Sequence, residues 1–172
     1  MTRLTLAGAA LTVLMAASLV ACTKPAADKP VADTGKIAAA VKADADQGVA
    51  DFNAHDAVKS ASHDAPDMVA MFHGAPNTVG ADADLATTKQ IFADSPNTKF
   101  SVTGESVDVA ASGDMAVYRA TYSYAYNDLK TKKPIVETGN YVVGYKKQPD
   151  GSWKQAWDIL ADTPAAPLAA KS

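Results

Sequence analysis

Residues 138–161 read TGNYVVGYKKQPDGSWKQAWDILA and carry the clearest structural signal in the chain. Two segments rich in Val, Tyr and Trp flank the turn sequence Pro149-Asp150-Gly151. Pro149 fixes its own backbone angle and ends the first segment, and Gly151 can adopt the positive φ that a tight turn needs. The stretch therefore predicts a β-hairpin whose aromatic side chains require a covering layer of helix.

The region before this hairpin has the spacing of helices. Apolar residues recur every three or four positions in a segment that begins near Lys36: Ile37, Val41, Ala45, Val49 and Phe52. This period predicts an amphipathic helix. His55 is expected to take a left-handed turn after it, and Asp56 to cap a short second helix. A third helix, capped by Asp82, is expected to end near Ser95.

Strand patterns occupy the rest of the domain. Asp67–Phe72 reads as a short buried strand, and Lys99–Val109 and Ala116–Asn127 alternate over longer stretches. In the last of these, four tyrosines share one side, opposite Arg119: Tyr118, Tyr122, Tyr124 and Tyr126. Helices followed by hairpin-linked strands predict an α+β fold, with helices covering one face of an antiparallel sheet.

Composition excludes several classes of protein. The chain has 172 residues, a formal net charge of −3 and one cysteine. No basic cluster is large enough to indicate a nucleic-acid partner. A single cysteine cannot form a disulfide within the chain.

The first 22 residues have the pattern of a bacterial lipoprotein signal peptide. Arg3 precedes the apolar run Leu4–Val20, which is shorter and richer in small residues than a typical transmembrane helix. The sequence Leu-Val-Ala-Cys that ends at Cys22 resembles a lipobox, whose cysteine is lipidated after cleavage. We expect residues 1–21 to be removed and residues 22–35 to form a lipidated, flexible tether.

The residue after the cysteine bears on location. It is Thr23 rather than Asp, which by resemblance to lipoprotein sorting signals implies attachment to the outer membrane, facing the periplasm. Membrane contact would be made through the lipid anchor alone. At the other end, residues 164–172 are expected to form a disordered tail.

Three motifs carry a family resemblance. They are NAHDA at residues 53–57, DMVAMFHG at 67–74 and GNYVVGYKKQPDGSWKQAWD at 139–158. Together they resemble the SnoaL-like and DUF4440 (ketosteroid-isomerase-like) families of the NTF2-like superfamily. The resemblance covers residues 36–163 and implies a cone, in which a strongly curved sheet wraps around the N-terminal helices and encloses an apolar pocket. It also implies a homodimer packed through the sheet, and an exposed row of tyrosines would supply such a contact.

The catalytic residues of steroid isomerases do not carry over. Steroid isomerases have a Tyr in the first helix, where this chain has Gly48. They have one Asp after the first strand and another on a later strand, where this chain has the segment 71–73 and Asn140 or Tyr141. Steroid isomerisation by that mechanism is therefore not expected.

Five side chains are candidates for the pocket: Arg119, Tyr141, Tyr145, Asp158 and His73. Strand alternation separates Gln155 and Trp157 from Ala156 and Asp158, and the resemblance suggests that the second pair faces the pocket. A buried carboxylate needs a partner or a raised pKa, so Arg119 is expected to pair with Asp158, as a structural ion pair or as part of a ligand site.

Two classes of function remain. The first is a non-catalytic lipoprotein whose cone binds a small apolar or aromatic molecule or a partner protein. The second is a small isomerase, dehydratase or hydrolase that uses Asp158 or His73 as acid or base. No cofactor or metal is expected, because His63, Asp67 and His73 lack the spacing of a metal site. Binding alone would need at most one polar anchor in the pocket, whereas catalysis would need two polar groups within hydrogen-bond reach of each other.

Replacing the lipobox cysteine tests the anchor. Cys22→Ser is expected to abolish membrane attachment, because the acyl chains are the only membrane contact, and to leave the thermal unfolding of the domain unchanged. Palmitate labelling and membrane fractionation would measure the attachment. A variant that still sediments with the membranes would contradict the prediction.

Overall fold

The computed structural model describes residues 31–128 and 130–163. The signal peptide, Cys22, most of the expected tether and the C-terminal tail lie outside these residues. The elements in chain order are α1 (Thr34–Asn53), α2 (Ala57–Ala61), β1 (Asp64–Phe72), β2 (Thr78–Val79), α3 (Ala81–Asp94), β3 (Lys99–Val109), β4 (Met115–Asn127), β5 (Pro134–Lys147) and β6 (Trp153–Asp162). None of the described helices has the length and apolar character needed to span a membrane.

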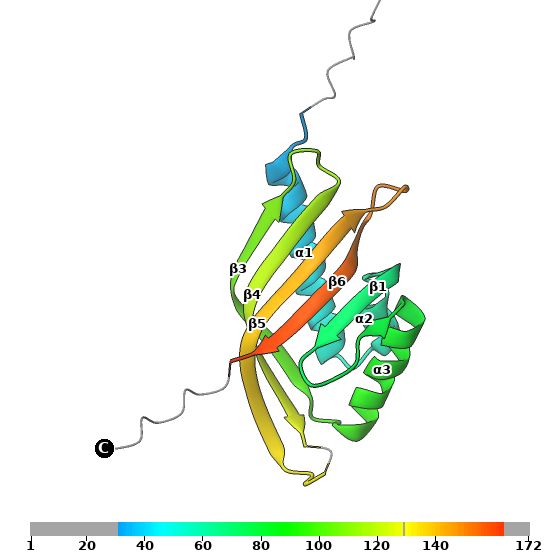
Figure 1. The fold of residues 1–172 in the computed structure, drawn as a ribbon, viewed down its shortest axis with the longest axis vertical. Coiled ribbons are helices and arrows are strands. Elements are labelled where there is room, and N and C mark those ends of the chain that lie inside the picture. Colours follow the sequence, from blue (N-terminus) through cyan, green and yellow to red (C-terminus); the bar gives the residue numbers. More distant parts are fainter. Residues whose placement is uncertain (1–30, 129, 164–172) are drawn as a thin grey trace, which may run out of the picture. The chain divides into compact units, whose positions relative to one another are not determined.

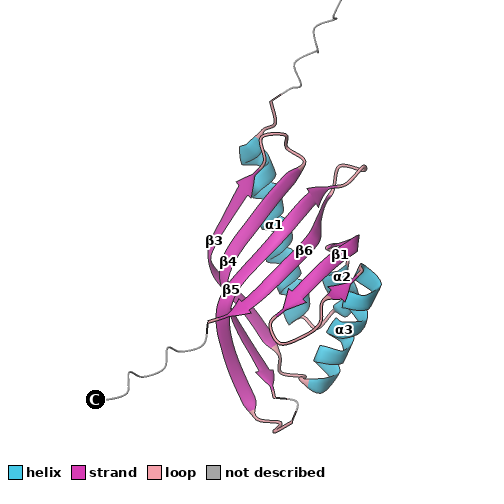
Figure 2. Ribbon diagram, in the orientation of Figure 1, coloured by secondary structure: helices cyan, strands magenta, loops and turns pink. Residues whose placement is uncertain are grey.

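One curved sheet organises the domain. Its strand order is β2-β1-β6-β5-β4-β3, and neighbouring strands are antiparallel except for the parallel pair of β1 and β6. The helices lie on one side of this sheet, with α1 running across β3 to β6 and α3 beside β1 (Figures 1 and 2). This is the predicted α+β cone, an open sheet bent around the first helix.

The hairpin of β5 and β6 forms as the sequence predicts. Gly151 has φ +87°, and the amide of Gln148 donates to the carbonyl of Ser152 at 2.8 Å across the turn. A register shift follows, because Gly144 pairs with Trp157 while Tyr145 pairs with Gln155. This β-bulge changes which side chains of β6 face the helices.

Gly144 and Trp157 are matched across the bulge. A Cβ atom at Gly144 would overlap the Trp157 indole ring, so the ring lies flat over the bare backbone. Any larger residue would displace the ring, which explains the glycine in the middle of a strand.

Local capping follows the sequence with one exception. Asp33 accepts from the amide of Lys36 at 3.0 Å and starts α1 two residues before the apolar pattern. His55 has φ +57° and Asp56 accepts from the amide of Lys59, as predicted for the turn into α2.

The predicted cap of the third helix was wrong. Gly80 rather than Asp82 precedes α3, with φ +94° and its amide bonded to the carbonyl of Met68 at 2.8 Å. The glycine lets the chain turn directly out of β2, so the helix begins before Asp82, which lies in the first turn.

The tyrosines of β4 face inward and build the core. Tyr118 is 0% exposed and Tyr122 is 1% exposed, and Tyr118 packs in one cluster with Val41 of α1 and with Val143 and Tyr145 of β5. The tyrosines therefore do not form the exposed row that would have supplied a dimer contact, because the concave face needs bulky side chains to fill the space beneath α1. The homodimer prediction loses that support.

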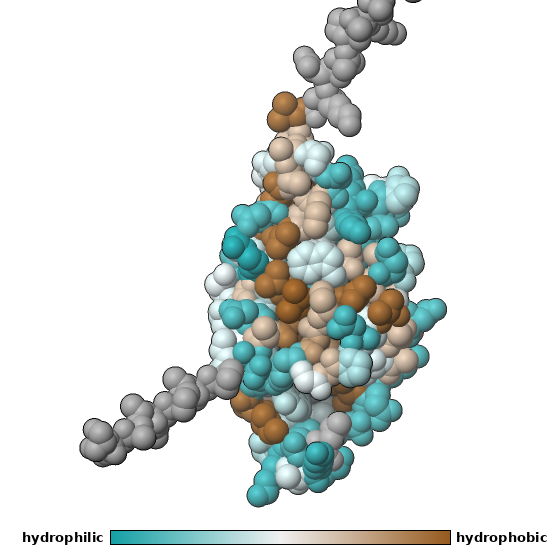
Figure 3. All heavy atoms as spheres, viewed as in Figure 1, coloured by the Kyte–Doolittle hydropathy of each residue, from teal (hydrophilic) through white to brown (hydrophobic). Residues whose placement is uncertain are grey.

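The opposite face of the sheet also carries apolar side chains. Side chains that alternate with the inward-facing core residues are half-buried there: Val117, Val142, Trp157 and Ile159. Figure 3 shows hydrophobic atoms along the middle strands and hydrophilic atoms around them. Dimerisation through this face stays a prediction.

Candidate functional site

A cavity of about 660 Å³ lies between the helices and the concave face of the sheet. One side is an aromatic wall made by α1, β3, β4 and β5: Phe52, Phe100, Tyr124, Tyr126 and Tyr141. Within it, Tyr124 and Tyr126 stack with their ring centres 4.8 Å apart. Such a wall accommodates flat or apolar ligands.

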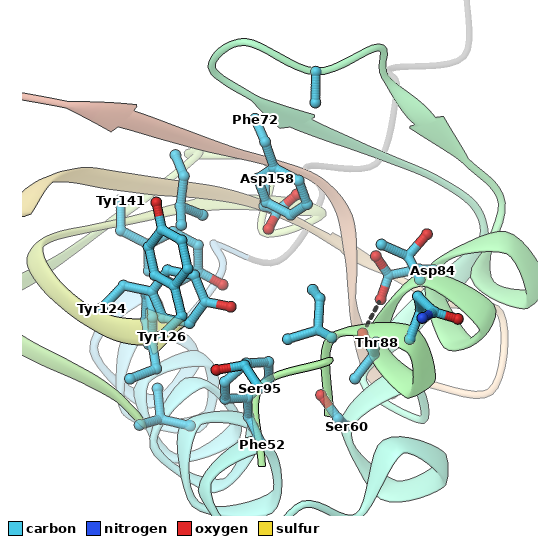
Figure 4. A pocket seen from close by; sticks show the side chains of 18 of the residues that line it. Phe52, Ser60, Phe72, Asp84, Thr88, Ser95, Tyr124, Tyr126, Tyr141 and Asp158 are labelled. Carbon is cyan, nitrogen blue, oxygen red and sulfur yellow. Dashed lines mark hydrogen bonds between the residues drawn. The ribbon is translucent and has the colours of Figure 1, made fainter. Parts of the chain in front are cut away.

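Three carboxyl groups reach the same cavity from separate elements. Asp64 comes from β1, Asp84 from α3 and Asp158 from β6. Figure 4 shows Asp158 and Asp84 across the cavity from the stacked tyrosine rings. The cavity thus has an aromatic side and an acidic side, with the two groups facing each other.

Asp158 is the most enclosed of the three. Its side chain is 7% exposed, and its Oδ1 accepts no hydrogen bond from any described residue. Burial, with the negative charge of Asp84 nearby, raises the pKa of Asp158 to about 8. The group is therefore largely a neutral acid at pH 7.

Asp64 and Asp84 are the other two carboxyl groups of the acidic side. Burial, together with the charges of Asp84 and Asp158, raises the pKa of Asp64 to about 8. Burial also raises the pKa of Asp84, whose Oδ2 accepts weakly from Thr88 Oγ1 at 3.5 Å. Two carboxyl groups this close share a proton more readily than they both ionise.

The lining contains acids but hardly any base. Among the described lining residues there is no Lys or Arg, and the only histidine is His73. Its Nε2 lies 3.0 Å from Glu137 and its Nδ1 lies 3.5 Å from Asp162. The three inner carboxyl groups therefore have no basic partner in the cavity wall. No group of three or more possible ligands in the described residues could hold a metal ion.

A second buried polar cluster lies beside the cavity, under α1. His63 Nδ1 is 2.8 Å from Asp44 and its Nε2 is 3.1 Å from Asp51. A carboxylate only accepts, so both contacts are hydrogen bonds when the ring is the doubly protonated cation. The hydrogen bond to Asp44 is the main cause that raises the pKa of His63, against the opposing effect of burial. Tyr145 faces Asp44, and burial raises the pKa of its hydroxyl.

The structure brings three of the five predicted residues to the cavity. Asp158, Tyr141 and His73 line it, with His73 among the exposed residues. Tyr145 is 0% exposed and lies in the core.

Arg119 is a correction. Its side chain is 54% exposed and pairs with Asp108 on the neighbouring strand. It alternates with the inward-facing Tyr118, so it cannot reach Asp158, and the predicted ion pair of Arg119 and Asp158 was wrong.

Strand alternation also failed at one position of β6. Gln155 lines the cavity although it was grouped with Trp157 on the other face. The bulge between Gly144 and Tyr145 removes one step of the alternation, so Gln155 and Asp158 both point inward.

Asp64 and Asp84 were missed. Asp64 precedes Pro66, and the strand was expected to begin only at Asp67, which left Asp64 in a loop. Asp84 offered a signal, since it lies four residues before Thr88 and seven before Ile91, on the face of α3 that lines the cavity.

Comparisons with known proteins identify the fold. No protein-family model matches the chain, and no curated protein matches it. A solved structure of a ketosteroid isomerase-like protein from Erwinia carotovora atroseptica is 21% identical, covers 75% of this chain and 96% of its own, and has a TM-score of 0.61.

Two further structures agree. A protein from the NTF2-like family of Streptomyces avermitilis is 16% identical over 73% of this chain and 95% of its own, with a TM-score of 0.62. The hexachlorocyclohexane dehydrochlorinase LinA-type3 from Novosphingobium barchaimii is 17% identical over 76% of this chain and 89% of its own, with a TM-score of 0.64. The fold is that of the NTF2-like proteins. Within this fold, the chain presents a cone with an aromatic wall and an acidic wall.

The carboxyl groups predict how stability depends on pH. The folded protein holds protons on Asp64 and Asp158 up to about pH 8, whereas the ordinary value for Asp is 3.8. Because the folded state binds more protons, the free energy of unfolding falls as pH rises from about 4 to about 8. The raised pKa of His63 acts in the same direction: its contribution is complete below 6.5 and is lost as pH rises through the folded value.

Asp158→Asn should therefore stabilise the domain near pH 8. The neutral amide avoids the cost of a buried charge, and the slope with pH should decrease by about 1.4 kcal/mol per pH unit at most. Urea unfolding at pH 5 and pH 8 measures both effects. Asp108→Asn, an exposed carboxylate on the outer face, is the matched control. An equal fall of stability with pH in wild type and Asp158→Asn would refute the assignment.

Proposed function

We propose that the cone binds a small, largely apolar or aromatic molecule, and that a lipid on Cys22 holds the domain at the outer membrane, facing the periplasm. The observation that carries the binding proposal is the cavity of about 660 Å³ with its aromatic wall. Sites for small molecules commonly have volumes of about 300 to 1,000 Å³ and apolar linings with a few polar groups.

The contents of the wall support a ligand with one polar end. Phe52 and Tyr124 offer ring surface, whereas Asp158 offers an acceptor oxygen without a partner among the described residues. A flat apolar body against the rings would leave a polar group to face the carboxyl side.

A dye assay tests binding. N-phenyl-1-naphthylamine, an uncharged aromatic dye that brightens in apolar sites, should bind the wild-type domain with one site per chain. Ile91→Trp should weaken binding at least tenfold, because Ile91 of α3 lines the cavity and the indole would fill it. Val58→Trp, at a position of α2 that is 63% exposed, is the control and should bind as wild type does. Equal binding by Ile91→Trp would locate the dye elsewhere and sink the proposal.

A second function, acid–base catalysis, is favoured by the carboxyl pair. Asp64 and Asp84 both line the cavity, and the charge of Asp84 acts on the Asp64 carboxyl group, which exceeds the single polar anchor expected of a purely binding cone. A carboxyl group that titrates near 8 is a stronger base than an ordinary one and can act as acid or base near neutral pH. The similar LinA-type3 structure is a dehydrochlorinase, an enzyme that eliminates hydrogen chloride. An isomerase or eliminating enzyme using Asp158, with the Asp64–Asp84 pair beside it, would fit these observations.

Deuterium exchange tests catalysis without knowledge of the natural substrate. 1-Indanone is small and aromatic, and a base removes the hydrogens next to its carbonyl. In D₂O the wild-type domain should speed their exchange at least tenfold over buffer, more so as pH rises toward 8, and Asp158→Asn should remove the acceleration. Proton NMR follows the loss of signal. An exchange rate equal to that in buffer, under conditions where the dye binds, would count against catalysis and leave binding intact.

A further inference from the structure

The cavity wall is strongly biased in charge. Five of the described lining residues carry carboxyl groups: Asp64, Asp84, Asp94, Glu137 and Asp158. The described lining includes no Lys or Arg, and His73 is already held by Glu137 and Asp162. An anionic ligand would meet five carboxyl groups and neither Lys nor Arg on this wall.

We propose that the ligand of the cone is a small organic amine, whose ammonium group donates a hydrogen bond to the carboxylate of Asp158 while its apolar body packs against the aromatic wall. This inference rests on the proposed binding function and specifies the chemical class of the ligand.

The state of Asp158 carries the inference. Its side chain is more than nine-tenths buried, it faces the cavity, and its Oδ1 accepts no hydrogen bond from the described residues. Arg119 points to the outer face and pairs with Asp108. A buried carboxylate is stable only with a counter-charge or a proton, and the described lining has no Lys or Arg to pair with Asp158. An ammonium group would supply both the missing donor and the missing charge.

The neighbouring acids strengthen the preference. Asp64 and Asp84 lie on the same wall, and the negative charge of Asp84, which raises the pKa of Asp158, would favour a cation at that position. The raised pKa values of Asp64 and Asp158 agree with this, since a bound cation can take the place of the protons that now neutralise them.

The opposite wall suits the same ligand. The faces of aromatic rings are negative and attract cations, and the stacked rings of Tyr124 and Tyr126 line the same cavity as Asp158 (Figure 4). The described residues give no metal-binding geometry, so an inorganic ion does not explain the carboxyl groups as well as an organic cation does.

Three ligands of matched size provide the test. Phenethylamine, 2-phenylethanol and 3-phenylpropionate share a phenyl ring and a short chain but are positive, neutral and negative at pH 7. Each is titrated against the bound dye N-phenyl-1-naphthylamine. The amine should displace the dye at a concentration about ten- to one-hundred-fold lower than the alcohol, which is the range of one hydrogen bond to a charged group, and the acid should be the weakest.

Two variants locate the preference. Asp158→Asn should reduce the advantage of the amine over the alcohol to less than threefold while the affinity for the alcohol stays unchanged, and Asp108→Asn should keep the full advantage. Circular dichroism checks that each variant is folded, and dye binding checks that its cavity is open. The inference is overturned if the alcohol or the acid competes as well as the amine, if none of the three displaces the dye, or if Asp158→Asn retains the preference. Failure of the dye itself to bind would instead overturn the proposed function.

Discussion

The packing of α1 into the bent sheet is the constraint on which the rest of the domain depends. A sheet that curves this strongly leaves more volume on its concave side than one helix can fill. Near the first half of the helix, Tyr118 and Tyr145 fill that volume and form a closed core with Val41. Beyond Gly48, where α1 approaches α2 and α3, the filling is incomplete, and the remaining space is the cavity. Core and site are therefore two ends of one interface.

Electrostatics divide that interface again. Under α1, His63 lies between Asp44 and Asp51, so negative charge there is matched by an internal cation. Across the cavity, Asp64, Asp84 and Asp158 have no Lys or Arg beside them in the described lining, and burial raises the pKa of each. Two acidic clusters a short distance apart thus have different chemistry. The first holds a histidine between its two carboxyl groups, whereas the second is open to a molecule that enters.

Most of the fold, but less of the site, could be predicted from the sequence. The hairpin turn at Asp150-Gly151, the left-handed His55 and the helical period of α1 are local signals, and each predicted its element correctly. The errors came from long-range geometry. The tyrosines of β4 are buried and Arg119 is exposed because the tyrosines lie on the concave face of the sheet. The residue pattern of a single strand does not indicate which of its faces will be concave. The bulge at Gly144 depends on a ring from the next strand, and it changed the position of Gln155. The carboxyl cluster joins β1, α3 and β6, so its proximity arises only when the chain folds.

The same bulge separates the two tryptophans of the chain. Trp153 packs against the core cluster near α1, whereas Trp157 lies over Gly144 on the other face of the sheet, and neither is among the residues that line the cavity. The fluorescence of Trp153 should therefore respond to loosening of α1. The fluorescence of Trp157 should respond to contact on the outer face of the sheet. A molecule in the cone would be close to neither. Binding in the site should instead change the absorbance of the tyrosines that line it. The two faces of the sheet can therefore be followed separately by optical spectroscopy.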